Sequence, residues 1–244
     1  MQNSTDSTNN SIEALNLYAK IEDLIGVKEV SLTLYNYYFD ILKNVNFNSI
    51  LDIGCGKGDF LYKIQKQFSP KFLQGIDRSS LMVEYAKEKG LNVSTKELNE
   101  ITEKVDIATA TFDMINYLTP QEFIEFFQDL KSVVKNNGYF IFDVNTEFGL
   151  SELAVGNFIA EDESRFLAIE SFYENGLYES NFTLFQKSEN LYTKSCDSIS
   201  QYYYSQEFFE LLSGWEIQSI IPIKLYDMED YDKTIYILKR VDSE

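Results

Sequence analysis

The chain contains no histidine and only two cysteines among its 244 residues. The missing histidine removes the usual general base at neutral pH and the commonest nitrogen ligand for metals. Two cysteines form no cysteine cluster, so we expect neither a zinc site nor a disulfide framework. Such sparse cysteine is typical of a reducing, cytoplasmic compartment. No clustered acidic motif favours magnesium either, and we predict no metal.

Positive charge is scarce, with 21 Lys and Arg against 39 Asp and Glu and a formal net charge of −18. A surface of this sign repels a polyanion, and no basic stripe interrupts it, so a nucleic-acid partner is disfavoured. A small neutral or cationic substrate suits this charge, although solubility explains it equally well.

Long apolar runs are also missing. No segment approaches the ~18 apolar residues that a membrane span needs, and we expect no membrane partner. Residues 1–11 are rich in Asn, Ser and Thr, which predicts a disordered tail rather than a signal peptide or anchor. The remaining length suffices for one globular domain with an insertion.

Three glycines at alternate positions interrupt the apolar stretch that begins at residue 50. Ile50–Ile53 predicts a buried strand, residues 54–58 (GCGKG) a turn, and the residues from Phe60 an amphipathic helix. Glycines in such a turn let a ligand come against the main chain. The spacing differs from the dinucleotide fingerprint G-x-G-x-x-G, and Asp52 would repel a pyrophosphate. A carboxylate there attracts an ammonium or a sulfonium, and S-adenosylmethionine carries both.

A second motif follows in residues 75–82 (GIDRSSLM), where Asp77 lies 19 residues after Gly58. This separation is about that expected for a ribose-binding acid. Together with the glycine loop, the segment resembles the class I S-adenosylmethionine-dependent methyltransferases. The resemblance implies that Asp77 binds the ribose hydroxyls, that Met82 packs on adenine and that Asp52 lies near the methionyl ammonium.

The resemblance implies further cofactor contacts. Glu97 and Leu98 stand where the family places an acid near adenine, although the family's usual Asp is absent. In related enzymes an N-terminal helix covers the cofactor and offers a tyrosine, here Tyr18; plain helix core is the alternative. Cys55 provides a small side chain in the loop, with a nucleophilic role as the minor alternative. The full set of expected cofactor residues is Tyr18, Asp52, Gly54, Cys55, Gly56, Asp77, Arg78, Met82, Glu97, Leu98 and Phe112.

Alternating strands and helices predict an α/β fold with a Rossmann-like, doubly wound, mainly parallel sheet and an antiparallel terminal strand. Strands are expected at 48–53, 72–76, 91–95, 105–110, 138–144, 215–223 and 234–239. Helices are expected within 12–43 and at about 58–68, 79–89, 120–135 and 207–213. Residues 148–202 break the pattern and predict an inserted small antiparallel sheet. The Rossmann-like domain would then comprise residues 12–147 and 203–244.

The insertion resembles that of a small-molecule subset of the family, which includes aminosugar N-methyltransferases. Such insertions cover the substrate cleft or form a dimer contact, so we expect a small-molecule substrate and a homodimer through the insertion. The alternative is that its aromatic side chains only build its own core. A contact with substrate would come from Gln201 or from the hydroxyls of Tyr202–Tyr204.

Methyl transfer from a sulfonium is an in-line displacement that mainly needs proximity and alignment. Open parallel sheets bind ligands beyond the carboxyl ends of their strands. Asp113 follows the fourth predicted strand, and Asp143 and Asn145 end the fifth on one face of the extended chain. We predict that these three residues lie nearest the transferred methyl group. The alternative is that Asp113 and Asn116 shape the turn.

The predicted function is therefore transfer of a methyl group from S-adenosylmethionine to a small molecule. An amine acceptor is favoured over a hydroxyl because the chain lacks histidine. Two alternatives stay open. One is a non-catalytic module that binds S-adenosylmethionine, and the other is a methyltransferase acting on protein or tRNA.

Overall fold

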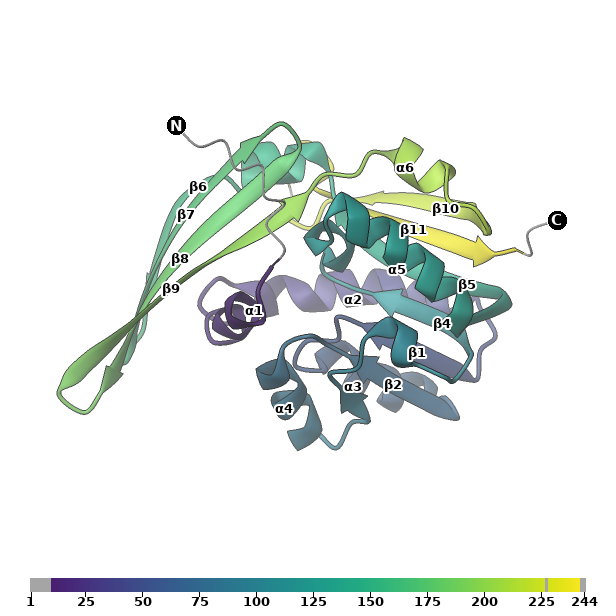
Figure 1. Ribbon diagram of the computed structural model, residues 1–244, viewed down its shortest axis with the longest axis horizontal. Helices are drawn as coiled ribbons and strands as arrows, with labels where there is room; N and C mark the ends of the chain where they lie inside the picture. Colours follow the sequence, from purple (N-terminus) through teal and green to yellow (C-terminus); the bar gives the residue numbers. More distant parts are fainter. Residues whose placement is uncertain (1–9, 227, 242–244) are drawn as a thin grey trace.

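The computed structural model describes residues 10–226 and 228–241, which form two sheets and the helices around them (Figure 1). The strands of the larger sheet, sheet A, are β1 (Ser49–Ile53), β2 (Phe72–Ile76), β3 (Val93–Ser94), β4 (Val105–Ala110), β5 (Val134–Asn145), β10 (Trp215–Ile223) and β11 (Lys233–Arg240). Sheet B contains β6 (Gly156–Glu161), β7 (Arg165–Glu174), β8 (Leu177–Ser188) and β9 (Leu191–Tyr202). The helices are α1 (Ile12–Ala19), α2 (Val27–Lys43), α3 (Asp59–Phe68), α4 (Ser80–Glu88), α5 (Pro120–Val133) and α6 (Gln206–Glu210). Short helical turns span Leu98–Glu100, Met114–Tyr117 and Gly149–Leu153.

Sheet A has the strand order β3-β2-β1-β4-β5-β11-β10. β1 is parallel to β2 and β4, β2 is parallel to β3, and β4 is parallel to β5. β11 runs antiparallel to both β5 and β10. The prediction of a Rossmann-like, mainly parallel sheet is confirmed. The strand order reverses between β1 and β4, and ligands of such sheets bind at the carboxyl ends of the strands at this point.

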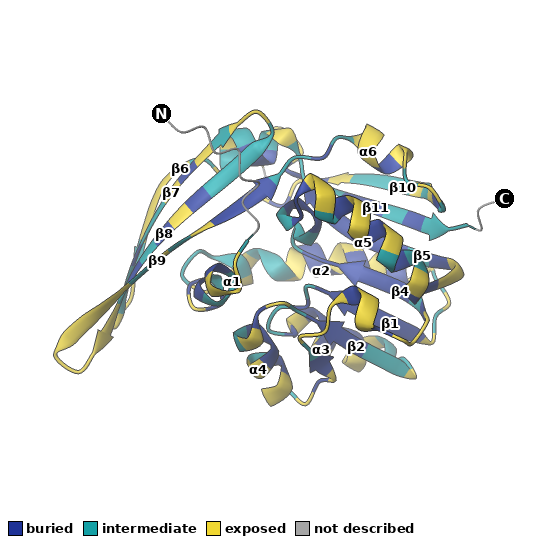
Figure 2. Ribbon diagram, viewed as in Figure 1, coloured by how far each residue is buried: buried dark blue, intermediate teal, exposed yellow. Residues whose placement is uncertain are grey.

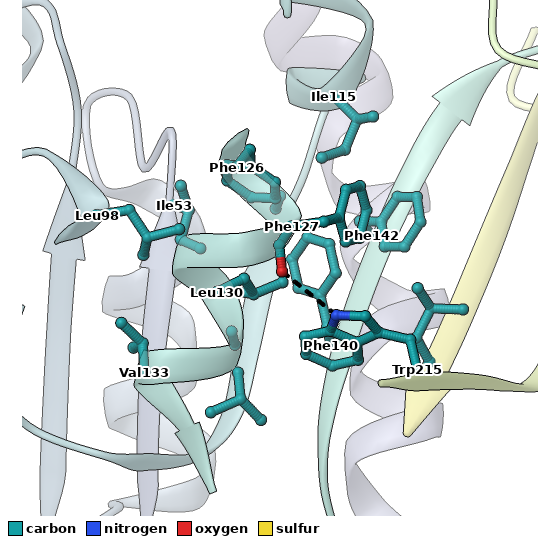
Figure 3. Close-up of a cluster of buried hydrophobic side chains, with 14 of the residues drawn as sticks. Ile53, Leu98, Ile115, Phe126, Phe127, Leu130, Val133, Phe140, Phe142 and Trp215 are labelled. Carbon is teal, nitrogen blue, oxygen red and sulfur yellow. Dashed lines mark hydrogen bonds between the residues drawn. The ribbon is translucent and has the colours of Figure 1, made fainter. Parts of the chain in front are cut away.

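Both faces of sheet A are covered because successive strand residues enter different apolar clusters. Phe140 and Phe142 pack in the cluster that contains α5, whereas Ile141 packs in the cluster that contains α2 and α3. Figure 3 shows the first cluster, where the indole N–H of Trp215 donates to the carbonyl of Phe127 at 3.5 Å. Burial on both faces explains why these strands read as continuous apolar runs instead of alternating ones.

The start of α5 follows its sequence signal. The Thr119 side chain accepts from the backbone N–H of Glu122, whose carboxylate accepts from the N–H of Thr119, and Pro120 occupies the first helical position. The helix ends at Val133, two residues before its predicted end at 135, because β5 already begins at residue 134. Two other elements are shorter than predicted, namely the two-residue strand β3 and the five-residue helix α6.

Sheet B confirms the inserted antiparallel sheet predicted after the fifth strand. It extends away from sheet A as a long curved arm whose far end is exposed (Figures 1 and 2). Sequence reasoning identified the segments of β7, β8 and β9 but missed β6. Residues 156–161 (GNFIAE) are almost wholly exposed, so no alternation of apolar and polar residues marks them as a strand.

The predicted N-terminal helical region is broken at residues 20–26 into α1 and α2. α1 packs Ala14 and Leu17 against Phe182 and Ile199 of sheet B. Residues 1–9 of the predicted tail lie outside the described residues, whereas its last two residues are ordered. Asn10 donates to the carbonyl of Ser200, and Ser11 caps α1. Within the described residues, no helix combines the length and hydropathy needed to cross a membrane.

Candidate functional site

A cavity of about 740 Å³ opens at the carboxyl ends of β1, β2 and β4. Its walls come from the loops after these strands, from the segment after β3, and from α1 and α2. Ten of the eleven predicted cofactor residues line it: Tyr18, Gly54, Cys55, Gly56, Asp77, Arg78, Met82, Glu97, Leu98 and Phe112. The eleventh, Asp52, is buried beneath the glycine loop. Residues far apart in sequence therefore converge on one cavity.

The glycine loop adopts a conformation that ordinary side chains resist. Gly54 and Gly56 have φ angles of +67° and +52°. A Cβ on Gly54 would lie 2.5 Å from Cγ of Met114, so the loop passes directly against the turn after β4. A Cβ on Gly56 would meet no atom within 4 Å, because this residue faces open space in the cavity. The space beside Gly56 is therefore open to a ligand.

The carboxylate of Asp52 is 1% exposed and only partly paired. Its Oδ1 accepts a 2.7 Å hydrogen bond from the hydroxyl of Thr109, whereas Oδ2 has no partner among the described residues. Burial is the main cause that raises the pKa of Asp52 to about 7. The hydrogen bond from Thr109 lowers this pKa, and the nearby charge of Asp77 raises it. An unpaired buried carboxylate oxygen is costly, and a cationic N–H donor would satisfy it.

Asp77, at the end of β2, connects the glycine loop to the start of α4. Its Oδ2 accepts from the backbone N–H of Gly56 and its Oδ1 from the N–H of Ser79, both at 2.8 Å. Burial raises the pKa of Asp77 to about 6, although these two donors oppose the shift. Each carboxylate oxygen keeps a further lone pair. The carboxylate is thus rigidly held at the cavity wall and able to accept from a diol.

The far end of the cavity is apolar, with a charged rim. Leu98, Met82 and Phe126 contribute apolar surface from three different elements. At the rim, Arg78 forms ion pairs with Glu97 at 3.3 Å and with Glu122 of α5 at 2.9 Å. A flat apolar group such as adenine suits this end, while Glu97 is engaged with Arg78.

α1 is fastened across the cavity by residues that sequence reasoning missed. The Asn16 side chain accepts from the Ser79 hydroxyl at 2.6 Å and from the N–H of Leu81 at 3.3 Å. After α1, Glu22 pairs with Lys57 of the glycine loop at 2.9 Å. No local motif marks Asn16 or Glu22, because their partners lie more than 30 positions away in the chain. These contacts hold Tyr18 over the cavity, where its ring meets Phe182 of sheet B edge-on.

The three predicted catalytic residues lie together, but none of them is among the residues that line the cavity. Asp143 is fully buried behind its wall, and its oxygens accept from four protein donors: the hydroxyl of Tyr38, the N–H groups of Phe112 and Asp113, and the ammonium of Lys233. This placement differs from the expectation that Asp143 faces a cleft. A neighbouring chain segment occupies the position expected for a ligand.

Asp113 and Asn145 instead converge on Gln201 of β9. The Gln201 amide donates to Asp113, and the Asn145 amide donates to the Gln201 carbonyl oxygen at 3.4 Å. Asn116 is buried between these elements. Its side-chain oxygen accepts from the N–H of Asn145, and its amide N–H donates to the carbonyl of Tyr202. The Asn116 side chain thus links the turn after β4 to β5 and β9.

Tyrosine hydroxyls gather beside Asp113. Burial, and then the charge of Asp113, raise the pKa of Tyr18. Burial and the neighbouring Tyr18 and Asp113 likewise raise the pKa of Tyr117, which also lines the cavity. These phenols stay protonated near neutral pH and offer O–H donors, not bases. The described residues contain no group of three His, Cys, Asp or Glu side chains arranged to hold a metal.

The sequence and the fold match known proteins. Residues 50–138 match a family model described as a methyltransferase domain. A putative methyltransferase of Bacillus subtilis, YqeM, is 28% identical over 124 residues, which are 47% of this chain and 49% of that protein. The chain spans half or less of the length of the curated relatives that it matches.

Solved structures extend the likeness to nearly the whole chain. A structure described as an S-adenosylmethionine-dependent methyltransferase from Clostridium acetobutylicum covers 93% of this chain and is itself covered completely, with a TM-score of 0.75 and 21% identity. The sugar N-methyltransferase KedS8 from a Streptoalloteichus species shares 13% identity with a TM-score of 0.68, covering 99% of this chain and 97% of its own. Residues 50–138 are therefore similar to a methyltransferase domain, and nearly the whole chain shares the fold of the structure described as an S-adenosylmethionine-dependent methyltransferase.

Proposed function

We propose that the protein transfers a methyl group from S-adenosylmethionine to a small molecule, with an amine acceptor favoured over a hydroxyl. One observation carries the proposal: Gly56 faces the cavity beside the rigid carboxylate of Asp77, and Asp52, two residues before the loop glycine Gly54, keeps an unpaired carboxylate oxygen. A diol acceptor, an unpaired anion and an apolar end are what ribose, methionyl ammonium and adenine require.

The chain's own residues would bind and orient the reactants. Bound S-adenosylmethionine supplies an electrophilic methyl group on a positively charged sulfur. Asp77 would accept the ribose hydroxyls, Leu98 and Met82 would pack on adenine, and Asp52 would accept from the methionyl ammonium directly or through a water. α1, with Tyr18, would cover the cavity and exclude water from the reacting atoms.

An amine acceptor fits the chemistry of the side chains around Asp113. An amine arrives with a lone pair once it is neutral, whereas a hydroxyl needs a base to remove its proton. The chain has no histidine, and the phenols beside Asp113 have raised pKa values. Asp113 and Asn145 would orient the acceptor through hydrogen bonds. The fold of a sugar N-methyltransferase over 99% of the chain agrees with an amine acceptor.

The proposal is tested by formation of S-adenosylhomocysteine from S-adenosylmethionine in the presence of a metabolite extract or an amine library. We expect product formation that is lost in Asp77→Ala, together with a mass gain of one methyl group in a small molecule. Loss of the acceptor activity after protease or ribonuclease treatment of the extract would instead indicate a macromolecular substrate. Tight cofactor binding without product from any extract would indicate a non-catalytic module.

A further inference from the structure

The turn after β4 has an unusual backbone conformation. Phe112 and Asp113 are consecutive, neither is glycine, and their φ angles are +57° and +54°. The left-handed region is unfavourable for residues with a side chain, so the surrounding structure must hold both residues there. The turn matters to the site because Phe112 lines the cavity and Met114 packs directly on Gly54.

A buried ionic cluster holds this turn. The N–H groups of Phe112 and Asp113 each donate to the carboxylate of Asp143 at 2.9 Å. On its other side, Asp143 accepts from the Tyr38 hydroxyl at 2.7 Å and from the Lys233 ammonium at 3.2 Å. Successive N–H groups in such a turn form a concave site for an anion, and here the anion is a protein carboxylate.

Lys233 also binds Asp113, which directly follows the cavity-lining residue Phe112. It is 2% exposed, and its ammonium binds the carboxylates of both Asp113 and Asp143. Burial lowers the pKa of Lys233, but the two carboxylates outweigh this and raise it, so the ammonium form persists. Gln201 binds the other oxygen of Asp113, which therefore has one fixed orientation near Tyr18 and Tyr117.

We propose that Lys233 is a positioning residue: through Asp143 it keeps Phe112 and Asp113 in the left-handed turn, and directly it aims the Asp113 carboxylate toward the acceptor. Lys233 does not itself line the cavity, whereas Phe112 does. Its contribution is alignment, which is the main requirement of an in-line methyl transfer. The alignment role for the reaction rests on the proposed function, whereas the control of the turn does not.

The first test follows the turn itself and needs no substrate. The chain has four methionines, so ¹³C-methyl methionine labelling gives few NMR signals. In Lys233→Leu we expect the Met114 signal to shift or broaden while Met82 keeps its position. Lys135→Leu is the matched control, because Lys135 forms a 2.7 Å ion pair with Asp106 at the opposite ends of the strands. If Lys233→Leu does not fold, Lys233→Gln keeps an N–H donor without the charge.

The second test separates alignment from stability. With an acceptor found as above, Lys233→Leu should lower kcat about ten- to a hundredfold, while the dissociation constant for S-adenosylhomocysteine stays within about threefold. Lys135→Leu should leave kcat unchanged. An unchanged Met114 signal in Lys233→Leu, or an unchanged kcat, would overturn the inference. If the parental protein methylates nothing, the proposed function fails, and the Met114 signal alone decides whether Lys233 controls the turn.

Discussion

Replacing Asp52 with asparagine should stabilise the ligand-free protein at pH 8 and weaken its binding of the cofactor. The carboxylate is buried, its Oδ2 has no partner among the described residues, and its pKa is raised to about 7 by burial. Asparagine has nearly the same shape and can still accept the bond from Thr109, but it cannot ionise. The substitution therefore removes a charge that the described groups of the protein satisfy poorly.

The magnitude follows from the pKa difference between the folded and unfolded chain. Because the folded pKa is raised, the contribution of Asp52 to stability is fully present below pH 4 and is lost as the pH rises to about 7. About three pKa units correspond to about 4 kcal/mol. Neutral Asp and Asn leave a similar donor unpaired, so the two proteins should match near pH 4, and the variant should already be more stable by about 1–2 kcal/mol at pH 5. At pH 8, the variant should be more stable by about 2–4 kcal/mol, or about 5–15 °C in Tm.

The assay is thermal and urea unfolding of both proteins at pH 4, 5, 6, 7 and 8, without ligand. Asp106→Asn serves as the control of opposite sign, since the bonds from Lys135 and Ser49 outweigh partial burial and hold the pKa of Asp106 at about 2. That variant should be destabilised throughout this range. Parallel pH profiles for the parental protein and Asp52→Asn would refute the reasoning. Calorimetry with S-adenosylhomocysteine should show about ten- to a hundredfold weaker binding to Asp52→Asn.

Other predictions concern the cavity walls. Asp77→Ala should weaken S-adenosylhomocysteine binding about ten- to a hundredfold, because a charged hydrogen bond contributes about 1.5–3 kcal/mol; equal calorimetric affinities would remove this assignment. Gly56→Ala should fold, since its Cβ meets no atom within 4 Å, although its φ of +52° should make the variant about 1–2 kcal/mol less stable. It should bind the cofactor more weakly by filling the cavity, and unchanged affinity would mean that no ligand approaches there. Asn16→Ala should release α1 from Ser79 and speed limited proteolysis before residue 27. Protection equal to that of the parental protein would show that α1 is held by its contact with sheet B alone.

Local patterns determined much of the fold. The strand, glycine turn and helix of residues 50–68 are contiguous, so their periodicity and glycine spacing were visible without any partner. The start of α5 was likewise visible locally, because the N-cap Thr119, Pro120 at the first helical position and Glu122 of the capping box lie within four consecutive residues. β6 was missed because its residues are almost all exposed and its sequence shows no periodic pattern of apolar residues.

The cofactor wall was also largely readable from the sequence, since most of the predicted residues follow a strand within a few positions and the sheet gathers strand ends at one edge. Asn16 and Glu22 were not, because only the docking of α1 onto α4 and the glycine loop brings their partners to them.

The role of Asp143 marks the limit of the sequence. Its position at the end of a strand was correctly predicted, and so was its closeness to Asp113. The sequence cannot show that Tyr38, 105 positions away, and Lys233, 90 positions away, meet at its carboxylate. Periodicity determines which face of a strand a residue occupies, whereas the partners of a buried charge depend on how distant elements pack. Only the tertiary structure therefore decided that this carboxylate binds the chain's own backbone and a buried lysine.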